Sequence, residues 1–160
     1  MHSATRSGGF SLIELVAILI VVGVIGVIAL GRLPDTNTFA TVAFAQEMRA
    51  ALRFAQKFAV ASGCEVQAVI DGAGDSYALQ LRADATGPAS NCLSASGGFA
   101  GNPLRDPQTG AAFTGTAPGG VDVTGSMNVT FDAEGGVTAG GTVSVAGETV
   151  SVTAPSGLIQ

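Results

Sequence analysis

The hydrophobic pattern begins with one continuous apolar run, residues 10–30, which only Glu14 interrupts. As an α-helix this run is about 32 Å long, enough to span the hydrocarbon core of a bilayer. A secretory signal peptide has a shorter apolar core, about 7–15 residues, so we predict a transmembrane helix. A carboxylate inside such a helix is costly, which makes Glu14 a functional candidate.

A second helical pattern occupies residues 38–62. Apolar residues recur there at steps of three and four, the spacing of one helix face: Phe44, Met48, Ala51, Leu52, Ala55, Phe58 and Ala59. Gly63 is expected to end this helix. Residues 34–38 begin with a proline and are typical of a break or a new helix cap. The two patterns together predict one long helix, interrupted or not, over residues 10–62.

After Gly63 the apolar period changes to two, as in a β-strand with one buried face. Residues 66–70 and 77–81 alternate in this way on either side of a turn-rich link and predict a hairpin. A second hairpin is predicted over residues 142–152, with Gly147 and Glu148 as a type II′ turn. Its expected register pairs Val145 with Val150 and Val143 with Val152.

Residues 83–120 are rich in Gly, Pro, Ser and Asn and predict a long loop, which is either functional or poorly ordered. Val121, Val123 and the stretch 128–131 open a further strand-rich part. We therefore expect an α+β fold. Its long N-terminal helix, membrane-spanning in the first half, packs on a C-terminal antiparallel β domain with two small sheets.

The composition is acidic, with 12 Asp and Glu against 7 Lys and Arg and a net charge of −5. This balance argues against nucleic-acid binding as the main role. Arg49, Arg53 and Lys57 lie four residues apart on the second helical pattern. They form either a local basic patch or, as we expect, a solvated stripe.

No catalytic or metal-binding constellation is recognisable in the sequence. The single histidine, His2, lies near the N-terminus. The rest of the chain therefore has no histidine for a Ser-His-Asp or Cys-His catalytic arrangement. Asp71 with Asp75, and Asp132 with Glu134, resemble fragments of calcium loops but do not follow EF-hand spacing. We expect ordinary turns there, and we predict neither an enzyme nor a bound cofactor, metal, nucleic acid or small molecule.

The stretch Gly8-Gly9-Phe10-Ser11-Leu12-Ile13-Glu14-Leu15 resembles the N-terminus of type IV pilins and pseudopilins. The resemblance implies that a prepilin peptidase cleaves between Gly9 and Phe10 and then methylates the new amine of Phe10. It also implies that Glu14 guides assembly by pairing with the amine of a neighbouring subunit. One departure is Gly31, where many major pilins have a proline, so the family's helix bend cannot be assumed.

This resemblance implies four parts: a leader (1–9), a transmembrane and assembly helix (10–31), the exported half of the helix (32–62) and a β-rich domain (63–160). Arg6 and the absence of acids in the leader keep it cytoplasmic. The chain is then expected in the bacterial inner membrane, with its C-terminal domain periplasmic, and later in a cell-surface pilus. The implied partners are other pilin subunits, through helix bundling, the prepilin peptidase and the pilus assembly platform protein.

Cys64 and Cys92 are the two cysteines of the chain. An exported domain lies where disulfides form, so we expect a bridge between them; two free buried thiols are the alternative. In the chain-entropy model the bridge would contribute about 3.5 kcal/mol.

Three later stretches, 52–66, 111–121 and 129–136, are similar to minor pilins of the mannose-sensitive haemagglutinin (MSHA) pilus, of the MshC type. The third also resembles the minor pseudopilin H and FimT-like domain. The expected function is therefore a structural, minor subunit of an MSHA-like type IV pilus. The alternatives are a minor pseudopilin of type II secretion, or a pilus-displayed binding protein that uses loop 83–120.

Overall fold

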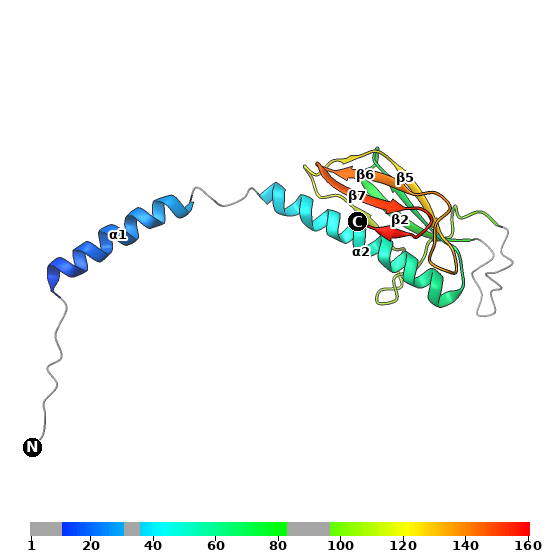
Figure 1. Cartoon of the computed structure of the whole chain (residues 1–160), viewed down its shortest axis with the longest axis horizontal. Coiled ribbons are helices and arrows are strands. Elements are labelled where there is room, and N and C mark those ends of the chain that lie inside the picture. Colours follow the sequence, from blue (N-terminus) through cyan, green and yellow to red (C-terminus); the bar gives the residue numbers. More distant parts are fainter. Residues whose placement is uncertain (1–10, 31–35, 83–96) are drawn as a thin grey trace, which may run out of the picture. The chain divides into compact units, whose positions relative to one another are not determined.

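The computed structural model describes residues 11–30, 36–82 and 97–160 (Figure 1). The chain divides into two compact units, Met1–Asp35 and Thr36–Gln160.

The first unit contains α1 (Leu12–Leu30). Ser11 precedes the helix, and its carbonyl accepts hydrogen bonds from the backbone N–H groups of Glu14 (3.0 Å) and Leu15 (3.2 Å). Glu14 therefore lies in the first turn, where a carboxylate interacts favourably with the helix dipole. Within the described residues, no helix is both long enough and apolar enough to cross a membrane.

The second unit is α+β. Its helix α2 (Thr36–Ser62) is followed, within the residues that are described, by eight strands: β1 (Val66–Asp71), β2 (Ser76–Leu81), β3 (Thr114–Thr116), β4 (Val123–Thr124), β5 (Met127–Phe131), β6 (Gly141–Val145), β7 (Glu148–Thr153) and β8 (Leu158–Ile159). They form two four-stranded antiparallel sheets, in the orders β3-β2-β1-β5 and β4-β6-β7-β8. The predicted α+β class with two small sheets is confirmed.

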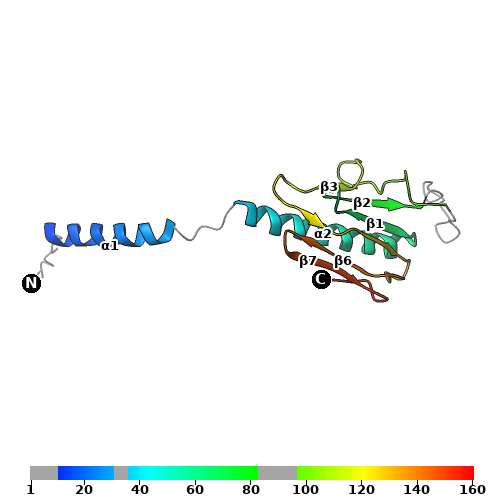
Figure 2. The same cartoon turned by 90° about the horizontal axis from the view of Figure 1, so that it is seen from above.

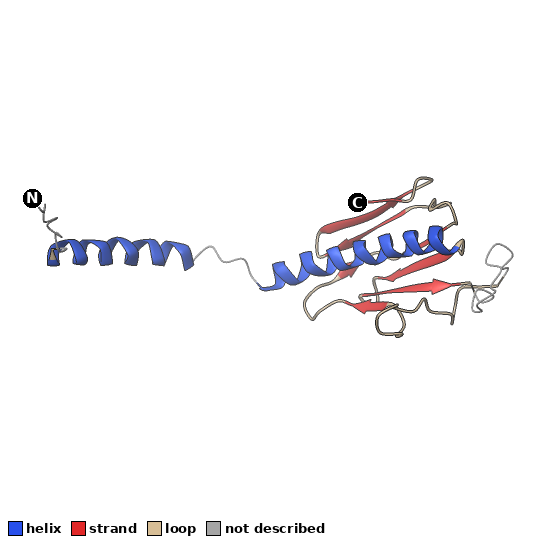
Figure 3. Cartoon of the chain, turned by 90° about the horizontal axis from the view of Figure 1, so that it is seen from below, coloured by secondary structure: helices blue, strands red, loops and turns tan. Residues whose placement is uncertain are grey.

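Helix α2 lies across one face of both sheets (Figures 2 and 3). The apolar stripe predicted from the sequence provides the contact: Phe44, Met48, Ala51, Leu52, Ala55 and Ala59 are at most 3% exposed. Every second residue of the strands points inward and completes the core, among them Val66, Ile70, Phe131 and Val150. Gly63, at φ +68°, ends the helix at the predicted place.

The first hairpin forms as predicted, with Ile70 opposite Tyr77 and Val66 opposite Leu81. The second hairpin has a different register from the predicted one, because Val143 lies opposite Val150 and Val145 opposite Glu148. Ala146 and Gly147, both at positive φ, form its turn. Positive φ at both central positions is the type I′ geometry that matches strand twist. The two-residue shift keeps the valines on the same face, so the alternation could not reveal it.

The stretch 128–131, predicted to open a further strand-rich part, lies in β5, which pairs with β1 in the first sheet, with Val129 opposite Ala68. The predicted long loop is also partly wrong. Residues 97–120 include β3. The Leu104 N–H donates to the Leu79 carbonyl, and the Leu79 N–H donates to the Phe113 carbonyl. Leu104 is 1% exposed, so part of the Gly- and Pro-rich stretch belongs to the core.

Candidate functional site

The residues that the sequence marks for processing and assembly lie at the N-terminus. Gly9 and Phe10 are outside the described residues, so the cleavage site stays a prediction. Glu14 is described, exposed, in the first turn of α1. The sequence Ser11-Leu12-Ile13-Glu14 also matches a helix capping box, so Glu14 suits the first turn of a helix for local reasons as well.

The side chains of α1 are exposed around the helix over the part where they are described. Leu12, Ile13, Leu19, Ile20 and Ile25 are each at least 60% exposed. A helix that is apolar on every side is normally covered by other apolar groups. The surface of this helix is therefore a candidate contact surface for other apolar groups.

In the second unit, Arg49 links α2 to the second sheet. Its Nη2 donates to Glu148 Oε1 (2.8 Å) and to the Thr149 carbonyl (2.6 Å), and Arg49 is 8% exposed. The expectation that Arg49 shares a solvated stripe with Arg53 and Lys57 is therefore wrong. Arg49 and Lys57 are eight residues apart, which is two helical turns and about 80° more. Arg49 therefore lies on the side of α2 that faces the sheet.

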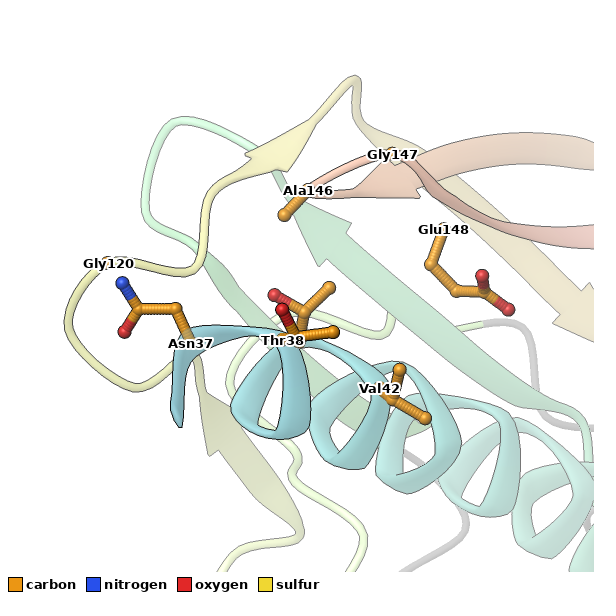
Figure 4. A pocket seen from close by; sticks show the side chains of 8 residues that line it. Asn37, Thr38, Val42, Gly120, Ala146, Gly147 and Glu148 are labelled. Atoms are coloured by element: carbon orange, nitrogen blue, oxygen red, sulfur yellow. The ribbon is translucent and has the colours of Figure 1, made fainter. Parts of the chain in front are cut away.

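A shallow pocket of about 520 Å³ lies at the first turns of α2 (Figure 4). Asn37, Thr38, Thr41 and Val42 line it from the helix, Gly120 from a loop, and Ala146, Gly147 and Glu148 from the β6–β7 turn. The Glu148 carboxylate at its rim is the one held by Arg49.

A second groove, of about 460 Å³, lies near the other end of α2. Arg53, Gln56 and Lys57 line it from α2, and residues 156–159 from the segment that ends in β8. Gln56 Nε2 donates to the carbonyls of Gly135 (2.7 Å) and Gly157 (3.1 Å), so the groove wall is held in place.

Tyr77 and Glu47 join the first sheet to α2. The Tyr77 hydroxyl donates to Glu47 Oε1 at 2.8 Å. Burial first, and then the Glu47 carboxylate, hold the pKa of the Tyr77 phenol above its ordinary value of 10.0. The phenol therefore stays neutral, and the contact is structural.

Two of the candidate calcium-loop acids, Asp71 and Asp132, accept hydrogen bonds within their own turns, and Asp75 accepts one from a distant strand. Asp71 Oδ1 accepts from the Ala73 N–H, and Asp75 Oδ1 accepts from the Val123 N–H. Asp132 Oδ1 accepts from the N–H groups of Glu134 and Gly136. The described residues contain no group of three His, Cys, Asp or Glu that could hold a metal ion.

Cys64 is buried at the end of α2, 6% exposed. Cys92 lies outside the described residues, so the bridge between them stays a prediction. The described aromatic residues of the predicted binding loop pack internally. Phe113 stacks on Phe54 at 4.9 Å, and the Arg82 guanidinium, which pairs with Glu65, covers the Phe99 ring at 5.0 Å.

No family model and no curated protein matches the sequence. Among solved structures, the chain is similar to the minor pseudopilin EpsH from the Type 2 Secretion System of Vibrio cholerae. The identity is 18%, the TM-score is 0.47, and the match covers 79% of this chain and 95% of that chain.

Proposed function

We propose that this chain is a structural subunit of a type IV pilin-like filament, assembled through its N-terminal helix. The observation that carries the proposal is α1, an apolar helix whose described side chains are exposed and whose first turn holds one acid, Glu14. Apolar surface of this extent is typical of a site that partners or lipid cover.

The second unit supports the same function because its core is assembled from residues between Phe44 and Ile159. A domain with its own core can be displayed by a helix that is engaged elsewhere. We propose that residues 10–30 hold the chain in the bacterial inner membrane, with the second unit periplasmic, until the helix joins the helices of other subunits on the assembly platform.

Glu14 has a specific role in this proposal. After a prepilin peptidase has cut between Gly9 and Phe10, the carboxylate of an incoming subunit pairs with the Phe10 amine of its neighbour. A buried charge is tolerated when it is paired and is costly when it is not, so the pair sets the axial register of the helices.

The test is the amount of chain in the sheared filament fraction, measured by immunoblot. We expect Glu14→Ala to remain in the membrane fraction and to fall by at least about tenfold in filaments, because it leaves the amine unpaired. Glu134→Ala, which removes an exposed acid from the second unit, is the matched control. Normal incorporation of Glu14→Ala would overturn the proposed pairing.

Gly9→Ala tests the processing step that precedes assembly. We expect a longer, unprocessed form on a gel and no methylated Phe10 by mass spectrometry. A chain of unchanged length would contradict the prepilin interpretation.

Two filament systems fit this function, an MSHA-like type IV pilus, in which the chain would be a minor subunit, and the pseudopilus of type II secretion. We keep the first as the main proposal because of the three similar stretches in the sequence. Co-purification separates them: in the first, the chain is recovered with pilus subunits, and in the second, with secretion components. The binding-protein alternative is weaker, because Phe99 and Phe113 are engaged within the second unit.

A further inference from the structure

The groove between the C-terminal half of α2 and β8 brings two cations together on a chain whose net charge is −5. Arg53 and Lys57, one turn apart on α2, are exposed and line it together with Leu158, which is 52% exposed. Among the described residues neither cation has an ion-pair partner, whereas Arg49 and Arg82 each hold a carboxylate. We call the surface formed by Arg53, Lys57 and Leu158 the basic groove.

The other wall of the basic groove is the edge of the second sheet, because β8 is the last strand in the order β4-β6-β7-β8. Ser151 and Gln160 exchange two backbone hydrogen bonds of 3.0 Å. The next pair, Val152 and Ile159, is therefore of the non-hydrogen-bonded kind, and the N–H and C=O of Ile159 point away from β7. Ile159 also lines the groove. A strand edge of this kind accepts the backbone of a further extended segment.

We propose that the basic groove receives an extended acidic segment of a different filament subunit, which lies along β8 and pairs its carboxylates with Arg53 and Lys57. Every second side chain of an added strand points to the sheet face that α2 covers. Carboxylates two residues apart in that strand are separated by about 7 Å. This spacing is close to the separation of about 6 Å between side chains one turn apart on a helix. An apolar residue beside the acids covers Leu158.

The choice of partner rests on the proposed function and deepens it. A minor subunit is outnumbered in its filament, so its neighbours are other subunits and not further copies of this chain. Nucleic acid is a poor occupant, because the chain is acidic overall and only two cations meet in the groove. Exposed ion pairs contribute little affinity. Subunits that are already held side by side by their N-terminal helices have a high effective concentration, so a weak contact is sufficient.

Photo-cross-linking of the full chain in the sheared filament fraction identifies the occupant. The variant is Leu158→benzoylphenylalanine, and the captured peptides are sequenced by mass spectrometry. We expect peptides of a different subunit with acidic residues two positions apart. The same substitution at Gln108, an exposed position outside the groove, should not capture them. Capture of lipid, of nucleic acid, of segments without such acids or only of other copies of this chain would overturn the inference, and so would no capture at all.

A defined peptide tests the charge pairing. The probe is a fluorescein-labelled peptide of alternating Val and Glu, and its anisotropy is measured with the full chain in a neutral detergent. Arg53→Gln together with Lys57→Gln should weaken binding by about tenfold. Arg105→Gln, which changes an exposed cation outside the groove, should leave it unchanged, and a peptide of alternating Val and Gln should bind the unchanged chain about tenfold more weakly. Equal binding of the two peptides, or no binding of the acidic one, would overturn the inference.

N-methylation of the acidic peptide tests the backbone contact. In an extended peptide the N–H groups of the valines lie on one edge and those of the glutamates on the other. Because β8 bonds only one of these edges, N-methylation at all valines or at all glutamates should differ in effect. One of the two peptides should bind about fivefold more weakly than the other, the factor expected for one lost hydrogen bond. Equal binding of both would overturn the addition to β8, even if the charge pairing holds.

These results separate the basic groove from the proposed function. If the chain is recovered in filaments but the probe at Leu158 captures no acidic segment of another subunit, the function stands and the partner is wrong. If the acidic peptide binds the groove as expected but the chain never enters filaments, the preference of the groove for acidic segments stands and the filament role is wrong.

Discussion

The two helices of this chain differ in where their apolar residues lie. In α1 apolar residues occupy every side, and those described are exposed; in α2 they occupy one stripe, which the two sheets bury. Helix α2 is therefore stabilised within its own unit by tertiary packing, whereas the surface of α1 is suited to partners outside the chain. The same residue types thus make a core in one helix and a contact surface in the other.

The largest expected effect is on the buried stripe of α2. Phe44→Ala removes a side chain that is 2% exposed and leaves a cavity, so the free energy of unfolding of the second unit should fall by about 3–5 kcal/mol. Denaturant unfolding of the full chain measures it. Phe39→Ala on the same helix and Leu19→Ala in α1, both exposed, should change it by less than about 0.5 kcal/mol. A large loss for Leu19→Ala would break the comparison between the helices.

The next effect concerns the space beside Tyr77 and Glu47. A Cβ on Gly115 would lie 2.3 Å from Tyr77 Cε1 and 2.8 Å from Glu47 Oε1. Gly115→Ala should therefore cost about 1–3 kcal/mol by overpacking, measured by the same unfolding experiment. Gly119→Ala, which meets nothing within 4 Å, is the control. Equal stability of the two variants would mean that this junction of α2 and the first sheet is not tightly packed.

A smaller loss is expected at the link between α2 and the second sheet. Arg49→Met keeps most of the buried length of the side chain but removes its bonds to Glu148 and Thr149, at a cost of about 1–2 kcal/mol. Arg53→Met, on the exposed side, should cost less than about 0.5 kcal/mol. If both variants unfold alike, Arg49 is not part of the buried side of the helix.

The smallest effect appears only at alkaline pH. The folded state raises the pKa of Tyr77 above 10.0, so the stability that its neutral form contributes is complete below pH 10 and declines as the pH rises above it. Tyr77→Phe should lose less stability between pH 10 and pH 11 than the unchanged chain. If Tyr77→Phe and the unchanged chain had the same pH dependence of stability, folding would not raise the pKa of Tyr77.

Much of the second unit follows from periodicity. The stripe of α2 and the alternation of Val66, Ala68 and Ile70 identify the buried faces, because both periods come from backbone geometry. Gly63 marks the helix end for a similar reason, since its positive φ suits glycine.

Other features depended on contacts between distant residues. Periodicity assigns Phe131 to a strand but does not say that this strand pairs with Val66 in the first sheet. It places Arg49 among polar positions, whereas the approach of the β6–β7 hairpin buries it. Leu104 lies in a stretch with a loop-like composition, and only its burial in the folded unit, at 1% exposed, shows that it belongs to the core.

The sequence alone predicts both helical patterns, most strand segments, the acids in the turns and the N-terminal pattern that carries the proposed function. Only the folded structure shows the strand order, the register of the second hairpin and the burial of Arg49. Local patterns report which face of an element is apolar. They do not report which partner covers that face, because the partner can be a residue 100 positions away, as Thr149 is from Arg49.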